Sequence, residues 1–262
     1  MSWNVGRIKS ETFVKDVESH ARLGSTNDRA LELCAMGLPP ERLPLLVLAD
    51  RQTAGRGRGT HRWWSADGAL TFSVVLDRNQ LALPADRLPI VALLAGLAVA
   101  RTLVDRLPEV PIGLKWPNDV WVMGRKLGGI LIETAADGPV VVGIGLNVNN
   151  SLAQAPDELQ HTAASLSDIT EQPWDRSDLL ISVLQNLEDE LKGLPEGLTQ
   201  LPRRWSRFCV LQDRMVAAQM GREQTICGVC CGISASGSLI LLTEHGERHV
   251  HGATTVRIID DR

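Results

Sequence analysis

The sequence predicts an α+β domain followed by a small all-β domain, and three observations support this fold class. Apolar residues make up 44% and charged residues 22% of the 262 residues, as in soluble globular proteins and unlike disordered chains. Helix-like and strand-like segments alternate up to residue 208. From Arg214 onward only short strand-like segments separated by turns remain. We therefore assign residues 1–209 to the larger domain and residues 210–262 to the smaller one.

The first elements follow from capping residues and from apolar runs. Residues 25–37 begin with Ser, Thr and Asn and end at a glycine, which predicts a short helix. Residues 45–50 and 70–76 are apolar and predict buried strands. Residues 87–107 predict a long helix, because the apolar face is continuous and Pro108 stands just past its end.

The later elements are shorter and are separated by turn residues. Four strand-like segments follow the long helix, with turns at Gly124-Arg125 and Asp137-Gly138; they are residues 113–116, 119–123, 126–135 and 140–148. Residues 150–173 are polar and irregular and predict a loop region, and helical patterns return at 175–193 and 197–208. The all-β domain is predicted to contain five strands, at residues 214–220, 225–234, 238–243, 247–252 and 254–259.

Charge and cysteine content restrict the class of protein. The formal net charge is −4 and the pI about 5.9, which does not favour a protein that coats nucleic acid. The longest apolar run, Ile90 to Ala100, is shorter than the roughly 20 residues of a membrane span, and the N-terminus lacks a signal sequence. Five cysteines without a framework spacing indicate a reducing compartment. We expect a cytoplasmic protein that binds neither nucleic acid nor membrane.

A segment rich in glycine and arginine, residues 52–59 (QTAGRGRG), is the strongest local signal. Alternating glycines allow backbone amides to turn toward a ligand, and the arginines between them supply cationic forks that suit phosphate or carboxylate. The segment lacks the Gly-Lys-Ser/Thr ending of a P-loop. An anion site, a plain surface loop and a nucleic-acid segment all remain open from the spacing alone.

Two further segments carry polar or glycine residues where a ligand could bind. Residues 115–119 (KWPND) hold an amide and a carboxylate beside Lys115, and Lys126 follows shortly after; the same composition also suits a simple turn. Together these groups suit a nucleotide, with Asp119 near its metal or triphosphate. Residues 143–149 (GIGLNVN) form a strand whose glycines allow a close approach by a ligand.

These segments together resemble those of the biotin–protein ligase family. Five motifs occur in that family's order and approximate spacing: STN (25–27), QTAGRGRG (52–59), KWPND (115–119), RKLGGILIE (125–133) and GIGLN (143–147). The resemblance covers residue 20 to the end. It implies an α+β, mixed-sheet catalytic domain of the biotin/lipoate–protein ligase type with a small C-terminal SH3-like β-barrel domain.

The resemblance also implies a two-step reaction. Biotin and Mg²⁺-ATP give biotinyl-5′-AMP, and a lysine of a biotin carboxyl carrier domain then takes the biotinyl group. The first step brings two anions together, so the site must gather cations and exclude water. The biotin-binding residues would be Ser25, Thr26, Asn27, Gln52, Arg56, Gly57, Arg58, Lys126 and Gly129. The catalytic residues would be Lys126, Arg56 and Arg58. ATP and the adenylate would meet Trp63, Lys115, Asn118, Asp119 and Asn147, with Asp119 at the Mg²⁺ ion.

The sequence departs from the family pattern at three places. Gly59-Thr60-His61 replaces the well-known bacterial continuation after the second arginine, so the role of His61 is open, and Ser65-Ala66 stands where the family commonly has Ser-Pro. Some 20 residues precede the first motif, too few for the winged helix-turn-helix of family members that act as repressors. A lipoate–protein ligase and a noncatalytic biotin sensor are the alternative functions, and a homodimer is a further partner to consider. The motifs KWPND (115–119) and GRGR (55–58) argue against the lipoate–protein ligase, and Lys126 with the expected lack of a DNA-binding domain argues against the sensor.

Three cysteines and two histidines are interpreted as structural residues, and one loop is predicted to move. Cys227, Cys230 and Cys231 are interpreted as small packing residues, and His249 with His251 as a strand pair without metal. The loop from Gly55 to His61 is predicted to be mobile when empty, because its two arginines would lack counter-charges and would repel each other. It would then order over the adenylate.

Overall fold

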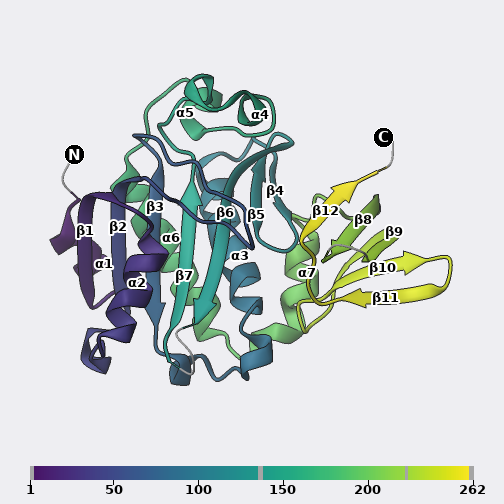
Figure 1. The fold of residues 1–262 in the computed structure, drawn as a ribbon, viewed down its shortest axis with the longest axis horizontal. Coiled ribbons are helices and arrows are strands. Elements are labelled where there is room, and N and C mark those ends of the chain that lie inside the picture. Colours follow the sequence, from purple (N-terminus) through teal and green to yellow (C-terminus); the bar gives the residue numbers. More distant parts are fainter. Residues whose placement is uncertain (1–2, 135–137, 222–223, 260–262) are drawn as a thin grey trace.

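The computed structural model describes residues 3–134, 138–221 and 224–259, and these residues form two β-sheets with helices around the first (Figure 1). The helices are α1 (Val5–Glu11), α2 (Thr26–Ala35), α3 (Ile90–Arg106), α4 (Asp157–Gln160), α5 (Leu166–Thr170), α6 (Arg176–Lys192) and α7 (Leu201–Ser206). The strands of the first sheet are β1 (Asp16–Leu23), β2 (Leu45–Gln52), β3 (Leu70–Leu76), β4 (Ile112–Lys115), β5 (Asp119–Val122), β6 (Arg125–Thr134) and β7 (Val140–Leu146). Those of the second are β8 (Met215–Met220), β9 (Gln224–Ile233), β10 (Leu239–Thr243), β11 (Gly246–Val250) and β12 (Thr255–Ile258). The α+β class that the sequence predicts is confirmed.

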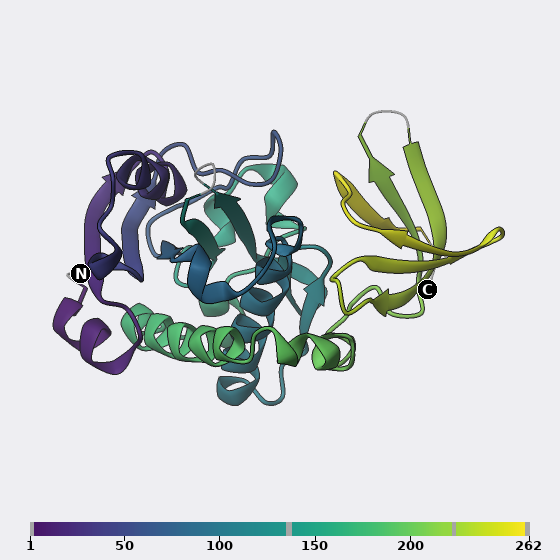
Figure 2. The same cartoon turned by 90° about the horizontal axis from the view of Figure 1, so that it is seen from below.

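The first sheet is mixed and has helices on both faces. Its strand order is β1-β2-β3-β7-β6-β5-β4, with β1 and β2 parallel and the remaining neighbours antiparallel. The parallel pair needs a crossover connection, and α2 supplies it while packing on β2, β3 and β7. On the opposite face lies α3, which is backed by α6 (Figure 2).

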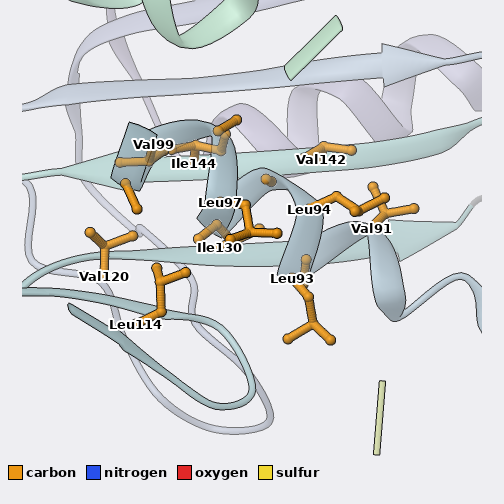
Figure 3. Close-up of a cluster of buried hydrophobic side chains, with 14 of the residues drawn as sticks. Val91, Leu93, Leu94, Leu97, Val99, Leu114, Val120, Ile130, Val142 and Ile144 are labelled. Carbon is orange, nitrogen blue, oxygen red and sulfur yellow. The ribbon is translucent and has the colours of Figure 1, made fainter. Parts of the chain in front are cut away.

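The helix α3 forms the centre of the hydrophobic core. Residues from Ile90 to Ala100 are buried all round the helix, as expected for a helix that is apolar on every side. Figure 3 shows its leucines and valines against Leu114, Ile130 and Ile144 of the sheet. By length and composition the stretch 85–106 could cross a membrane, but 78% of the apolar 18-residue window within it is buried inside the protein. Its apolar character is therefore explained by the core.

Side chains alternate between the two faces of the sheet along each strand, and the two faces have different roles. Along β7, Val142 and Ile144 belong to the core with α3, whereas Gly143 and Gly145 point to the face that carries α2. Because Ser73 and Leu131 are the register partners of Gly143, they share that face. This second face, near the N-terminal end of α2, is where the cleft described below forms.

The second sheet is antiparallel, with the order β11-β10-β9-β8-β12. The five predicted strands occur within one to two residues of their expected limits. The first sheet is bonded to the segment between α7 and β8, because Leu114 of β4 donates to Phe208 O (2.7 Å) and accepts from Val210 N (3.0 Å). Trp116 Nε1 adds a bond to Gly237 O (2.9 Å), in the turn between β9 and β10. Strand β12 is the edge of the second sheet that lies toward the first (Figure 1).

Several local predictions need correction. The segment 150–173 is not a continuous loop, since it contains α4 and α5; short helices with one apolar side each leave little periodic signal. Residues 196–206 form a 3₁₀ turn followed by α7 rather than one helix. Strand β1 was not predicted, because this edge strand has polar residues on both faces and therefore no apolar run or alternation. The predicted turn at Asp137-Gly138 falls in part outside the described residues.

The cysteine and histidine interpretations are confirmed only in part. Cys230 is buried, but Cys227 and Cys231 are exposed and do not pack in the core. His249 lies on β11 and contacts Ser238 Oγ (3.0 Å) and Glu247 Oε1 (2.9 Å), whereas His251 lies beyond the end of that strand. Within the described ranges, His, Cys, Asp and Glu side chains form no group of three suited to a metal ion.

Candidate active site

A cleft of about 320 Å³ lies between the first sheet, the loop after β2 and strand β12. Of the predicted site residues, all except one line this cleft: Ser25, Thr26, Asn27, Gln52, Arg56, Gly57, Arg58, Trp63, Lys115, Asn118, Asp119, Lys126 and Gly129. They come from β2, α2, β4, β5, β6 and two loops, so only the fold brings them together.

The N-terminal end of α2 forms the floor of the cleft. Ser25 caps the helix by accepting from Asp28 N (3.4 Å), and its side chain is buried. Thr26 N donates to Gln52 Oε1 (2.7 Å), which satisfies one of the free amides of the first turn. Gln52 stands at the end of β2, so this bond fixes the helix terminus against the sheet.

A buried hydrogen-bonded chain continues from the floor across the sheet. Ser73 Oγ lies 2.8 Å from Thr26 Oγ1 and 2.6 Å from Asn27 Oδ1, and it is fully buried in the otherwise apolar β3. Asn27 Nδ2 donates to Glu133 Oε2 (2.8 Å). Since both ends of its amide have partners, the orientation of the Asn27 side chain is fixed.

The glycines of β7 make room for the protein's own side chains. A Cβ atom at Gly143 would lie 2.0 Å from Asn27 Oδ1, and one at Gly145 would lie 2.7 Å from the ring of Trp63. Both glycines also line the cleft, so the close approach of a ligand that the sequence suggested stays a prediction. The ring of Trp63 lines the cleft, and its buried Nε1 has no hydrogen-bond partner among the described residues. A buried donor of this kind is suited to a ligand acceptor.

The glycine–arginine loop folds as a tight hairpin. Gly57 N donates to His61 O (2.8 Å), His61 N donates to Arg58 O (3.1 Å), and Trp63 N donates to Gly55 O (2.9 Å). A Cβ atom at Gly55 would meet Trp63 O at 2.6 Å, so glycine is required there. The backbone of His61 therefore closes the hairpin, while its side chain is exposed and lines the cleft.

The two arginines of this loop have different surroundings. Arg56 makes a two-pronged ion pair with Glu133 (2.8 and 2.6 Å) and contacts Asp28 (2.7 Å). Burial opposes the charged form of Arg56, but the hydrogen bonds and charges of Glu133 and Asp28 raise its pKa overall. The expectation that both arginines lack counter-charges in the empty loop is therefore wrong for Arg56; the mobility of the loop stays a prediction.

Arg58 reaches from the loop to the second sheet. Its guanidinium donates to the backbone carbonyl of Ala253 (2.9 Å), just before β12. Burial lowers the pKa of Arg58, and the charge of Asp119 partly offsets this. Among the described residues no carboxylate forms an ion pair with Arg58, which leaves its guanidinium available to an anion.

Two lysines and two further arginines complete a positive cleft. Lys126 Nζ lies 2.6 Å from Asp119 Oδ1, and Lys115 Nζ lies 4.7 Å from the ring centre of Trp121. Burial lowers the pKa of Lys115; Asp119 opposes this, and the nearby charges of Lys126 and Arg257 reinforce it. Among the described lining residues, Asp119 is the one carboxylate, against six cations: Arg56, Arg58, Arg62, Lys115, Lys126 and Arg257.

Comparisons with known proteins agree with this arrangement. Residues 21–149 match the model of the Biotin/lipoate A/B protein ligase family. The bifunctional ligase/repressor BirA of Bacillus subtilis is 31% identical over 252 residues, which cover 94% of this chain and 75% of that protein. The biotin–[acetyl-CoA-carboxylase] ligase of Mycobacterium tuberculosis is 33% identical over 223 residues, which cover 84% of this chain and 81% of that protein. This chain belongs to the biotin protein ligase family.

A solved structure of the biotin protein ligase family extends the likeness to three dimensions. The biotin protein ligase from Aquifex aeolicus in complex with biotin and ATP superposes with a TM-score of 0.81 at 30% identity. The match covers 94% of this chain and all of that one, so both sheets of the biotin protein ligase fold are included.

Two sets of residues in this family member differ from the sequence-based expectation. Asn147 does not line the cleft: its side chain donates to Ala164 O (3.2 Å) and accepts from Asn150 Nδ2 (2.9 Å). Contact between Asn147 and adenine stays a prediction. The sequence missed Arg257 and its neighbours on β12, which line the cleft across the two sheets. It also missed Ser73 and Glu133; a serine within the apolar run 70–76 was the one available signal for the first.

Proposed function

We propose that this enzyme joins biotin to ATP and then transfers the biotinyl group to a lysine of a biotin carboxyl carrier protein. One observation carries the proposal: the cleft gathers six cationic side chains and one carboxylate beside a buried polar floor. A reaction between a carboxylate and a triphosphate, both of them anions, needs such an excess of positive charge. A site that only binds an apolar ligand does not.

The chemistry proceeds in two balanced displacements. In the first, a carboxylate oxygen of biotin attacks the α-phosphorus of ATP and pyrophosphate leaves, which gives biotinyl-5′-AMP. In the second, the neutral ε-amine of the carrier lysine attacks the acyl carbon of this mixed anhydride. AMP leaves with the bonding electrons, and the amine loses a proton as the amide forms. The protein contributes positioning, charge compensation and exclusion of water.

Lys126 and Arg58 are proposed to stabilise the charge that develops in the first step. Lys126 lies on β6, where the ion pair with Asp119 holds its ammonium at the wall of the cleft. Arg58 lies on the loop, with its guanidinium held by Ala253 O. Lys115 and Arg257 add charge at the side nearest β12, where the triphosphate is expected to extend. Ser25, Thr26, Asn27, Gln52 and Gly129 are proposed to surround biotin.

The metal is proposed to enter as part of Mg²⁺-ATP rather than as a resident ion. Mg²⁺ in nucleotide sites is bound through one or two carboxylates together with phosphate oxygens and water. Asp119 is the lining carboxylate that fits this role, and the amide of Asn118 lies beside it. Lys126 pairs with one oxygen of Asp119, and the other oxygen takes no part in this ion pair.

The proposed partners are the carrier domain and, in addition, a second copy of this chain as a homodimer. Sedimentation measures the dimer directly.

We place the enzyme in the cytoplasm, because all five cysteines are free thiols and such thiols persist in a reducing compartment. We also expect no sequence-specific DNA binding, and a retarded band on one operator-like duplex at physiological salt would contradict this.

Biotin-dependent exchange of radiolabelled pyrophosphate into ATP tests the proposal. Exchange with biotin, little exchange with lipoate and transfer to a purified carrier domain are the expected results. Exchange with lipoate in preference to biotin would favour a lipoate–protein ligase. Biotin binding without any exchange would favour a sensor.

A further inference from the structure

Glu133 joins the glycine–arginine loop to the floor of the cleft. Its two oxygens accept from both terminal nitrogens of Arg56, at 2.8 and 2.6 Å, and Oε2 also accepts from Asn27 Nδ2 at 2.8 Å. A two-pronged arginine–carboxylate pair fixes direction as well as distance. The carboxylate is about a quarter exposed, so solvent screens the pair less than it would on an open surface.

The charge around Arg56 differs from that around the other cleft cations. Glu133 and Asp28 both contact its guanidinium, so two carboxylates compensate one positive charge. By contrast, Lys126 pairs with a single carboxylate, that of Asp119. Arg58 donates to a neutral carbonyl, and Lys115 faces the ring of Trp121. An anion entering the cleft therefore gains little from Arg56, because its field is already cancelled locally.

We propose that Glu133 is a positioning residue that clamps the side chain of Arg56 to Asn27, so that loop and pocket floor form one rigid unit. This inference rests on the proposed biotin-activating function and revises one part of it. The side chain of Arg56 holds the loop in place rather than stabilising the reacting anions, so the empty loop would be fixed at Arg56 instead of mobile as expected from the sequence. Lys126 and Arg58 keep the catalytic roles given above.

The clamp also explains why the amide of Asn27 has a single orientation. Ser73 Oγ occupies its Oδ1 at 2.6 Å, and Glu133 occupies its Nδ2 at 2.8 Å. The network therefore extends from the buried β3 strand, through the floor, to the loop. A pocket held in this way before the ligand arrives avoids the entropic cost of ordering these groups on binding. Loss of Glu133 should consequently weaken biotin binding more than ATP binding.

Three variants separate a clamp from a direct electrostatic role. Glu133→Gln removes the charge, Arg56→Lys keeps the positive charge but cannot form the two-pronged pair, and Glu133→Gln with Arg56→Lys combines them. Glu32→Gln is the matched control, because it breaks another glutamate–arginine pair, with Arg29, on the exposed side of α2. Each variant is measured by pyrophosphate exchange for KM of biotin and of ATP.

For a clamp, we expect either single change to raise KM for biotin roughly tenfold or more, the loss typical of a charged hydrogen bond, with KM for ATP little changed. The double variant should be no worse than the poorer single one, because both remove the same interaction. If Arg56 acts directly on an anion, Glu133→Gln frees its charge and biotin binding is unchanged or improved, and Arg56→Lys retains activity. Either of these results would overturn the clamp.

A second measurement does not depend on catalysis. Limited trypsin digestion cleaves after Arg58, a bond that every variant retains, and its rate reports local opening of the loop. Wild type and Glu32→Gln should be cleaved slowly, and Glu133→Gln and Arg56→Lys several-fold faster. Equal rates in all four would refute the clamp. A wild-type chain without biotin-dependent exchange would instead refute the proposed function, whatever the digestion shows.

Discussion

Lys126 Nζ and Asp119 Oδ1 lie 2.6 Å apart on neighbouring antiparallel strands. The strands hold both side chains at one wall of the cleft, so the lysine has a defined position before substrate arrives. A substrate carboxylate that binds Lys126 must share this ammonium with Asp119. The pair therefore orients the lysine, and it moderates the affinity for the biotin carboxylate at the same time.

Lys126→Ala is expected to lower the rate of adenylation by ~10²-fold or more, because it removes a charge-stabilising group from the reacting anions. Pyrophosphate exchange at saturating biotin and ATP measures this loss. Lys192→Ala is the matched control, since Lys192 makes an ion pair of the same length, 2.6 Å, with Glu188 on the exposed side of α6. Near-wild-type exchange in Lys126→Ala would refute the assignment.

Arg58→Gly is expected to make adenylate but to release it early. The substitution removes the bond to Ala253 O, which joins the loop to the second sheet over the cleft. Free biotinyl-5′-AMP then labels lysines of bystander proteins, which can be measured beside biotin affinity. Arg87→Gly, an exposed arginine outside the cleft, serves as the control. Lost biotin affinity without extra labelling would indicate a rigid pocket wall instead of a lid.

Gly143→Ala is expected to raise KM for biotin at least roughly tenfold and to destabilise the protein by about 1–3 kcal/mol through overpacking. The new Cβ atom would lie 2.0 Å from Asn27 Oδ1, so the amide must leave its place on the floor. Gly197→Ala is the control, because a Cβ atom there meets nothing within 4 Å. An unchanged KM for biotin would mean that Asn27 does not contact the substrate.

Lys115→Met is expected to stabilise the fold by roughly 0.5 kcal/mol or more while it lowers kcat/KM for ATP. Burial lowers the pKa of Lys115 below its ordinary 10.5, so its protonated form is disfavoured in the folded state. Since the unfolded chain binds this proton more tightly, the penalty is present in full below the lowered pKa. It disappears as the pH rises from the lowered value through 10.5.

Urea unfolding of both proteins at neutral pH and above pH 10.5 checks the sign of this effect. The gain from Lys115→Met should shrink at the higher pH. A gain that is constant with pH would show that packing of the methionine, and not the removal of a buried charge, stabilises the variant.

The sequence predicted those parts of the molecule that depend on local patterns. A capping serine and a final glycine predicted the helix α2, and apolar runs predicted the strands β2 and β3. The family motifs predicted the residues of the floor and of the loop. Arg257 could not be found in this way, because its place at the cleft depends on how two sheets meet. The pairing of Glu133 with Arg56 spans 77 residues and likewise has no local signal.

The bond from Arg58 to Ala253 O places little restriction on how the amino-acid sequence of this region can evolve. The acceptor is a main-chain oxygen, which every amino acid provides, so substitutions at position 253 leave it in place. The segment before β12 can therefore vary in sequence while the attachment of the loop persists. Alanine scanning reveals the contact only from the donor side, at Arg58, because residue 253 is already alanine. A deletion that shifts the backbone would expose it, and exchange of the second sheet between related enzymes should preserve it.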